Sequence, residues 1–186
     1  MAESSPSRNP STREPTTIRQ ARVEDVIAIA ELGAHVFTAT FAHSVSPDEL
    51  QNFLDESYTT AAITKDINDN TKDIIVATKP DGTVLGFGYL TRGSNEPCVA
   101  DVDDKVELQR IYVHPSAHGK GIGGLLATRI ESMAQERGFK NIWLGVWEEN
   151  HKAIKAYEKW GYKQVGDHDF VIGSVVQTDY IMLKEL

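Results

Sequence analysis

One segment of the sequence joins a strand-like run of residues to a group of glycines. It reads Val106-Glu-Leu-Gln-Arg-Ile-Tyr-Val-His-Pro-Ser-Ala-His-Gly-Lys-Gly-Ile-Gly-Gly-Leu-Leu126. Glycines that open a helix let a ligand approach the backbone closely, and the free N–H groups of the helix start attract an anion. Lys120 adds a positive charge to the same loop. The segment therefore predicts a binding site for a phosphate group.

Two familiar phosphate-binding loops fit this segment poorly. The P-loop pattern GxxxxGK[ST] fails because Lys120 precedes its glycine and no Ser or Thr follows. The dinucleotide pattern GxGxxG is matched by Gly119, Gly121 and Gly124, and Glu148 follows near the place of a ribose-binding acid. Only 62 residues remain after Gly124, however, and the preceding sheet looks antiparallel. A doubly wound domain needs more βα units than this length allows.

A third interpretation rests on a resemblance that two motifs carry. His118-Gly-Lys-Gly-Ile-Gly123 resembles motif A of the GNAT acetyltransferase superfamily, [Gln/Arg]-x-x-Gly-x-[Gly/Ala] after a strand. Asn150-His-Lys-Ala-Ile-Lys-Ala-Tyr-Glu-Lys-Trp-Gly-Tyr162 is similar to motif B, Asn-x-x-Ala-x-x-x-Tyr-x-x-x-Gly-[Phe/Tyr]. The two motifs stand in the family's order and spacing, and the resemblance covers about residues 17–186. His118 departs from the pattern, since the family has Arg or Gln there.

A narrower resemblance involves both ends of the predicted domain. The segments Phe37–Phe41, Ser46–Leu54 and Gln177–Lys184 look like those of polyamine acetyltransferases of the PaiA type. This similarity favours a small cationic amine as the acceptor.

The resemblance implies that acetyl-CoA is the cosubstrate and that no metal takes part. The residues implied to bind acetyl-CoA are Ile111, Tyr112, Val113, His118, Gly119, Lys120, Gly121, Ile122, Gly123, Gly124, Asn150 and Ala153. The glycines would hold the diphosphate, and the strand at 111–113 would pair with the pantetheine arm. The N–H of Val113 would polarise the thioester carbonyl, and the amide of Asn150 would hold the arm.

Glu107 is the expected general base. An amine attacks only when neutral, and an alkylammonium has a pKa near that of lysine, about 10, so a proton must leave. Several family members place a catalytic Glu on this strand, and Glu107 would act directly or through a water. Glu107 and Val113 are an even number of residues apart, so both side chains are expected on one face. The alternative is an exposed acid in an acidic stretch with Asp101, Asp103 and Asp104.

Tyr157 is the expected general acid for the leaving thiolate. It matches the tyrosine of motif B, and this match implies the role. The alternative is an ordinary packing role, because Ala153, Ile154, Tyr157 and Trp160 recur at helical spacing.

The elements that must position these residues follow from the hydrophobic pattern. Strands are expected at about 18–21, 73–78, 84–91, 106–113, 141–147, 162–171 and 175–183, and helices at about 25–37, 46–54, 60–67, 121–137 and 150–160. Ser46-Pro47-Asp48-Glu49 is a typical helix start, and Pro80-Asp81-Gly82 a typical hairpin turn. The predicted class is α/β. The GNAT resemblance implies a mixed central sheet of about seven strands, with a splayed parallel pair and helices on both faces.

Composition limits the possible partners. The chain has 186 residues, 19 basic and 27 acidic, for a net charge of −8. This balance argues against nucleic-acid binding and favours a cationic partner. The single cysteine excludes an internal disulfide and fits a reducing compartment, so the cytoplasm is expected. No run of about 18 apolar residues predicts a membrane span.

The remaining expectations concern the tail, the substrate side and the histidines. Residues 1–16 contain three prolines and no large apolar residue beyond Met1, which predicts a flexible tail before a domain at 17–186. Five acids between Glu96 and Glu107 are expected around the amine. His168 is expected in a surface turn rather than at the substrate mouth, and no histidine shows the spacing of a metal ligand.

Taken together, the sequence predicts an N-acetyltransferase acting on a small cationic amine, polyamines first, by direct attack in a ternary complex. A protein N-terminus or lysine is an alternative acceptor. A non-catalytic acyl-CoA-binding regulatory protein is an alternative from another class. Family members often dimerise through their C-terminal strands, so a homodimer is also considered.

Overall fold

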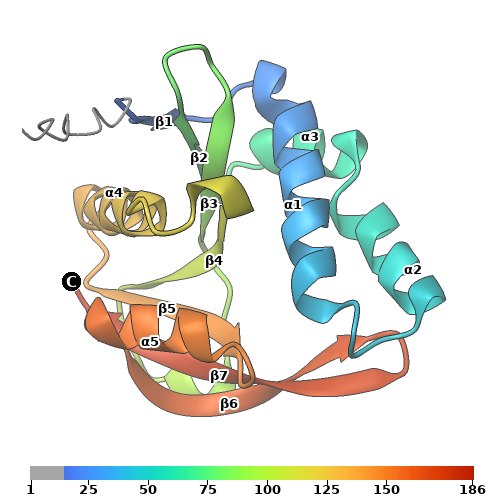
Figure 1. The fold of residues 1–186 in the computed structure, drawn as a ribbon. Helices are drawn as coiled ribbons and strands as arrows, with labels where there is room; N and C mark the ends of the chain where they lie inside the picture. Colours follow the sequence, from blue (N-terminus) through green and yellow to red (C-terminus); the bar gives the residue numbers. More distant parts are fainter. Residues whose placement is uncertain (1–14) are drawn as a thin grey trace, which may run out of the picture.

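The computed structural model describes residues 15–186, and the predicted tail at 1–16 lies almost wholly outside this range. Seven strands form one mixed sheet in the order β1-β2-β3-β4-β5-β7-β6 (Figure 1). The strands are β1 Thr17–Gln20, β2 Lys72–Thr78, β3 Val84–Thr91, β4 Lys105–Val113, β5 Asn141–Trp147, β6 Lys163–Ile172 and β7 Val175–Glu185. The helices are α1 Val26–Phe41, α2 Pro47–Ser57, α3 Thr60–Ile67, α4 Ile122–Glu136 and α5 His151–Lys159, with short 3-10 turns at η1 Val23–Asp25, η2 Pro97–Val99 and η3 Pro115–Ala117.

The predicted splayed pair is confirmed in β4 and β5. These two strands run parallel and pair only at their beginnings, where Lys105–Glu107 face Asn141–Trp143. Both strands continue beyond this point, β4 to Val113 and β5 to Trp147, without pairing to one another. One edge of β4 is therefore left without a partner strand.

A β-bulge in β4 accompanies the splay. Opposite β3, the register shifts so that Tyr89 pairs with Arg110 but Leu90 pairs with Leu108, which leaves Gln109 extra. An extra residue reverses which face the following side chains take. Val106 and Leu108 before the bulge, and Val113 after it, pack in the same core cluster, so Glu107 points to the opposite face. The expectation that Glu107 and Val113 share a face is therefore wrong.

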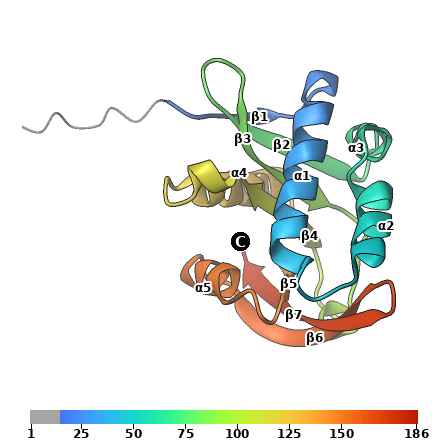
Figure 2. The same ribbon diagram turned by 45° about the vertical axis from the view of Figure 1, so that its right-hand side comes forward.

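Helices cover both faces of the sheet, as predicted. One core cluster packs α4 and α5 against one face, with Leu126 and Ile130 fully buried. The other packs α1, α2 and α3 against the opposite face (Figure 2). Ile29, Ile63 and Phe87 are fully buried there. No helix among the described residues is long and apolar enough to cross a membrane.

The helix α2 starts at a well-capped position. The Ser46 side chain accepts a hydrogen bond from the Glu49 N–H, while Glu49 accepts from the Ser46 N–H, and Pro47 stands in the first turn of α2. Glu49 also accepts hydrogen bonds from the backbone and hydroxyl of Ser174 in the β6–β7 turn. These contacts lower the pKa of Glu49 to about 2. The hydrogen bonds to Ser174 connect the start of α2 to the turn between β6 and β7.

Asp25→Ala is expected to destabilise the fold by about 2 kcal/mol at pH 7. Asp25 is 5% exposed and accepts hydrogen bonds from Arg19 Nη1 and Nη2 at 2.7 and 2.8 Å and from the Arg22 N–H at 2.8 Å. Its pKa is lowered, chiefly by Arg19, so this stabilisation holds above the unfolded pKa of about 3.9 and is lost as the pH falls through the lower folded value. Urea unfolding at pH 7 measures the change. Glu24→Ala, an exposed acid on the same turn, is the control, and an equal effect in both variants would contradict the assignment.

Candidate active site

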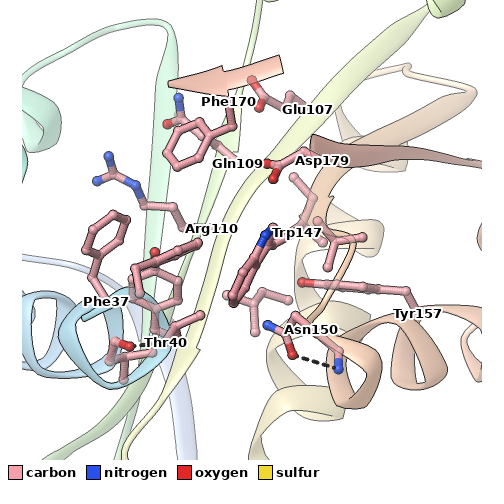
Figure 3. Close-up of a pocket in the computed structure, with 18 of the residues that line it drawn as sticks. Phe37, Thr40, Glu107, Gln109, Arg110, Trp147, Asn150, Tyr157, Phe170 and Asp179 are labelled. Atoms are coloured by element: carbon pink, nitrogen blue, oxygen red, sulfur yellow. Dashed lines mark hydrogen bonds between the residues drawn. The ribbon is translucent and has the colours of Figure 1, made fainter. Parts of the chain in front are cut away.

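A cavity of about 340 Å³ opens where β4 and β5 separate. We call it the central pocket. Its walls come from α1, α2, the four strands β4, β5, β6 and β7, and the start of α5 (Figure 3). Aromatic side chains form much of one side: Phe37, Phe41, Phe53, Tyr58, Tyr112, Trp147 and Phe170. Such a surface suits an aliphatic chain and, through the faces of the rings, a cation.

Glu107 lies in this pocket rather than on the exposed surface. It stands at the last paired position of β4, opposite Trp143, at the fork of the two strands. Burial raises the pKa of Glu107, and Glu96 adds to the effect, whereas Ser94, Arg110 and His168 partly offset it. A carboxyl with a raised pKa in a cavity is a suitable proton acceptor near neutral pH.

The predicted gathering of acids around the substrate is only partly right. Of the acidic stretch, Glu96 and Glu107 line the central pocket, but Asp101, Asp103 and Asp104 do not. Those three lie exposed in the loop before β4, where Asp104 pairs with Lys140 at 2.8 Å. The chain turns between them and Glu107, so proximity in sequence does not bring them to the cavity.

The structure corrects the placement of His168 and adds an acid that the sequence analysis missed. His168 lies within β6, not in a turn, and lines the central pocket. Its direct cross-strand partner is Asp179 on β7, which also lines the pocket. Asp179 falls in the segment 177–184 that resembles the PaiA type. The alternation of side chains along this strand, taken with that resemblance, was the signal that could have pointed to Asp179. Burial raises the pKa of Asp179 to about 6.

Arg110 is a second residue that the sequence analysis missed. Its guanidinium carbon lies 5.0 Å from the ring centre of Tyr58 and 5.2 Å from that of Tyr89. The Tyr58 hydroxyl donates a hydrogen bond to the Tyr112 hydroxyl at 2.9 Å. The bulge turns Arg110 and Tyr112 to this face, so the side chain of Tyr112 lines the central pocket.

The open edge of β4 presents backbone groups to the gap. The His114 N–H donates to the Leu85 carbonyl of β3 at 2.8 Å, so His114 and Leu85 form a hydrogen-bonded pair. N–H directions alternate along an antiparallel strand. The N–H and C=O groups of Ile111 and Val113 therefore point away from β3, into the gap toward β5. Ile111 offers the same kind of donor as the predicted Val113, two residues nearer to Glu107.

His118 reaches into this gap. Its Nε2 lies 2.9 Å from the Val113 carbonyl oxygen, and Lys152 Nζ lies 3.5 Å from its Nδ1. A carbonyl only accepts, so Nε2 carries the proton and donates, and Nδ1 is left to accept from Lys152. His118 thus contacts the backbone that the family resemblance assigns to the pantetheine arm.

The glycine loop, residues 118–124, has the backbone shape that anion binding requires. Gly119 and Gly121 adopt φ angles of 75° and 83°, and Gly121 is the N-cap of α4. The first N–H groups of a helix have no partner within it, so those after Gly121 are free to bind a ligand. Cβ atoms added at Gly119 and Gly121 would meet no atom of residues 15–186 within 4 Å, so this part of the chain leaves the space above the loop open. These features fit a diphosphate.

Motif B forms α5 at the other side of the gap. Tyr157, Asn150 and Ala153 all line the central pocket. The Asn150 side-chain oxygen accepts a hydrogen bond from the Ala153 N–H at 3.2 Å and caps α5, which leaves its amide NH₂ as the donor for a ligand (Figure 3). The Tyr157 ring packs edge-on against Trp160 and Tyr162. Tyr157 therefore packs in the core and also faces the pocket.

The hydroxyl of Tyr157 is available for chemistry. No hydrogen bond from another residue within 15–186 engages it, and burial raises the pKa of Tyr157. The hydroxyl therefore carries its proton at neutral pH and is a hydrogen-bond donor to a group in the pocket, although the raised pKa makes it a weaker acid than a free tyrosine. In the same part of the chain, no group of three or more His, Cys, Asp and Glu residues is arranged to hold a metal ion.

Known proteins match both the sequence and the fold. Residues 38–162 match the acetyltransferase (GNAT) family. An uncharacterized N-acetyltransferase of Mycobacterium tuberculosis is 30% identical over 162 residues, covering 87% of this chain and 98% of that protein. The spermidine N(1)-acetyltransferase of Thermoplasma acidophilum is 27% identical over 171 residues, 90% of this chain and 96% of that protein.

Solved structures with a bound cosubstrate share the fold. The PaiA N-acetyltransferase of Thermoplasma acidophilum in complex with coenzyme A has a TM-score of 0.74 at 24% identity, covering 92% of this chain and 99% of that one. The Salmonella typhimurium protein yncA, solved with its cofactor acetyl-CoA, has a TM-score of 0.65 at 22% identity, covering 92% and 94%. With its two motifs, its forked sheet and these relatives, the chain belongs to the acetyltransferase (GNAT) family and is an N-acetyltransferase.

Proposed function

We propose that the protein transfers the acetyl group of acetyl-CoA to a small cationic amine of the polyamine kind, by direct attack in a ternary complex. The observation that carries the acceptor class is the central pocket, where three carboxylates, Glu96, Glu107 and Asp179, line an aromatic cavity. The similarity to a spermidine acetyltransferase supports the same class. A reaction of this kind needs no metal, and the cytoplasm suits its substrates.

Each part of the site would have a distinct task on the cosubstrate side. The free N–H groups of the glycine loop would bind the diphosphate, with Lys120 adding charge. The Ile111 and Val113 backbone would pair with the pantetheine arm and donate to the thioester carbonyl oxygen as negative charge develops on it. The Asn150 amide would hold the arm in place. His118 would have to give up its contact with the Val113 carbonyl when the arm binds.

Proton transfers would complete the reaction. Glu107 would accept the proton that the ammonium must lose, directly or through a water, so that the nitrogen lone pair can attack the carbonyl carbon. Tyr157 would donate a proton to the sulfur as the C–S bond breaks. The roles fit the positions of these two residues on opposite sides of the pocket, one on β4 and one on α5.

A panel of acceptors tests the function. Purified protein with acetyl-CoA and spermidine, spermine, putrescine or butylamine is expected to release free CoA, detected with a thiol reagent. Peptides with a free N-terminus or an internal lysine serve as the competing acceptors. Turnover only with the peptides would replace the small amine by a protein acceptor. CoA binding in calorimetry without release from any acceptor would favour a non-catalytic acyl-CoA-binding protein.

A further inference from the structure

Asp179 lies in a corner of the central pocket that three strands build. It faces Trp147 of β5 on one side and His168 of β6 on the other, each as a direct cross-strand partner. Directly paired side chains in an antiparallel sheet project to the same face. His168 in turn places its Nδ1 2.9 Å from Glu96 Oε1. The corner therefore contains two carboxylates with an imidazole between them.

The hydrogen bonds of this corner are incomplete. The Asp179 Oδ1 atom is buried, and no group within residues 15–186 hydrogen-bonds to it. Its Oδ2 atom lies 3.8 Å from His168 Nε2. At 3.8 Å the two atoms are too far apart for a hydrogen bond, so His168, whose Nδ1 faces Glu96, does not complete the hydrogen bonding of the Asp179 carboxylate. A buried carboxylate without donors is costly, and an ammonium with three N–H donors is the group that would satisfy it.

A glycine keeps the corner open. Gly145 lies on β5 between Trp143 and Trp147 and is exposed, although its strand is in the middle of the sheet. A Cβ added at Gly145 would lie 3.4 Å from Asp179 Oδ2 and 3.8 Å from His168 Nε2. Because Gly145 has no side chain, the space between Trp143 and Trp147 stays open toward the Asp179 carboxylate.

Asp179 lies at about the same height along the sheet as the backbone N–H donors of β4, those of Ile111 and Val113. Glu107 is level with Trp143, and Asp179 is level with Trp147, four residues further toward the open end of the fork. Because the bulge adds one residue to β4, the residue of β4 at the same level as Asp179 is Tyr112, five positions after Glu107. Asp179 also contributes to raising the pKa of Tyr112, as expected for neighbours. Asp179 is therefore at the level of the Ile111 and Val113 N–H groups, where the thioester would lie.

We propose that the Asp179 carboxylate binds the ammonium of the acceptor and brings its nitrogen to the open end of the fork. This inference rests on the proposed function and adds the residue that selects a cation. Asp179 is then a substrate-binding residue. Glu107, nearer to the closed end of the fork, keeps the separate task of accepting the proton, which at this separation reaches it through water.

The electrostatics of the empty pocket agree with this role. Burial raises the pKa of Asp179 to about 6, and His168 offsets only part of the effect. The charged or titratable groups that face the corner are His168 from β6, Glu96 from the loop before η2, and Tyr112 and Glu107 from β4. A carboxyl with a raised folded pKa destabilises the fold above that pKa. Residues that bind substrate are often kept at such a cost to stability.

Asp179→Asn separates a binding role from a structural one. The amide has the same shape and no charge, so the acceptor KM is expected to rise about 30-fold. The KM for acetyl-CoA should stay within about twofold of the wild type, and kcat at saturating amine should change far less than the acceptor KM. The melting temperature at pH 7 should rise rather than fall, because the unpaired buried charge is gone. Asp169→Asn, an exposed acid beside His168 on the opposite face of β6, is the matched control and should change none of these values.

The outcomes separate this inference from the proposed function. An unchanged acceptor KM in an active Asp179→Asn variant overturns the role of Asp179 alone, and a lowered melting temperature with unchanged acceptor KM makes it structural. If the wild type releases no CoA with any amine, the proposed function fails, and calorimetry with spermidine decides the inference. Binding by the wild type that is lost in Asp179→Asn then supports it, whereas no binding by the wild type overturns it.

Discussion

A Tyr157→Phe variant is expected to turn over about 100-fold more slowly than the wild type, with unchanged affinity for CoA. The reason is that the hydroxyl lies in the central pocket with no partner among the described residues. A tyrosine hydroxyl carries its proton at neutral pH and can donate it to the departing sulfur. Phenylalanine keeps the ring that packs against Trp160 and Tyr162 but has no proton to donate.

The measurement compares kcat from CoA release with the Kd for CoA from calorimetry. Tyr162→Phe is the matched control, because Tyr162 lies against Tyr157 at 5.7 Å, is buried, and does not line the central pocket. Its hydroxyl lies outside the pocket, so its loss should leave both kcat and the Kd for CoA near the wild-type values. A wild-type kcat in Tyr157→Phe would leave Tyr157 with the packing role alone.

The fold was largely predictable because local signals agree with one another. The Ser46-Pro47 start of α2, the turn at Pro80–Gly82 and the strand at Asn141–Trp147 all lie where the sequence places them. Their patterns are complete within a dozen residues. The bulge at Gln109 has no such local pattern, since a bulge depends on the register of two strands, and missing it reversed the expected face of Val113.

The residues of the site also fall into a group that local motifs predict and a group that only long-range strand pairing brings together. The glycine loop and Tyr157 belong to contiguous motifs and could be recognised. Asp179 and Glu107 are 72 positions apart in sequence and reach one cavity only because β7 pairs with β5 and β5 with the start of β4. Arg110 faces the cavity only because of the bulge. Long-range pairing of this kind cannot be derived from spacing along one chain.

The bulge and the splay together give β4 two different surfaces beyond the fork. Past the fork, the backbone edge of β4 is free toward β5, and this edge suits the extended arm of a cosubstrate. The side chains of Arg110 and Tyr112 point instead to the face covered by α1 and α2, where the acids and aromatics form the central pocket. The two substrates would therefore meet at β4 from different directions, as direct attack requires.

A Glu107→Gln variant is expected to lower kcat about 100-fold at pH 7 and to remove the pH dependence that the wild type shows on the acid side. Glutamine keeps the size of the side chain but cannot accept a proton. The pKa of Glu107 is raised by burial, so the wild-type kcat should fall on acidification at a pH above the ordinary Glu value of about 4.3. The active form is the carboxylate, and activity is lost as the pH falls through the raised pKa.

The profile of kcat at saturating amine is the right measurement, because it reports groups in the ternary complex and not the binding of the amine by Asp179. Asp103→Asn removes an exposed acid of the same stretch and should leave both kcat and its profile unchanged. A Glu107→Gln profile that follows the wild type, at whatever rate, would show that another group takes the proton. Glu107 would then contribute only negative charge that attracts the amine to the central pocket.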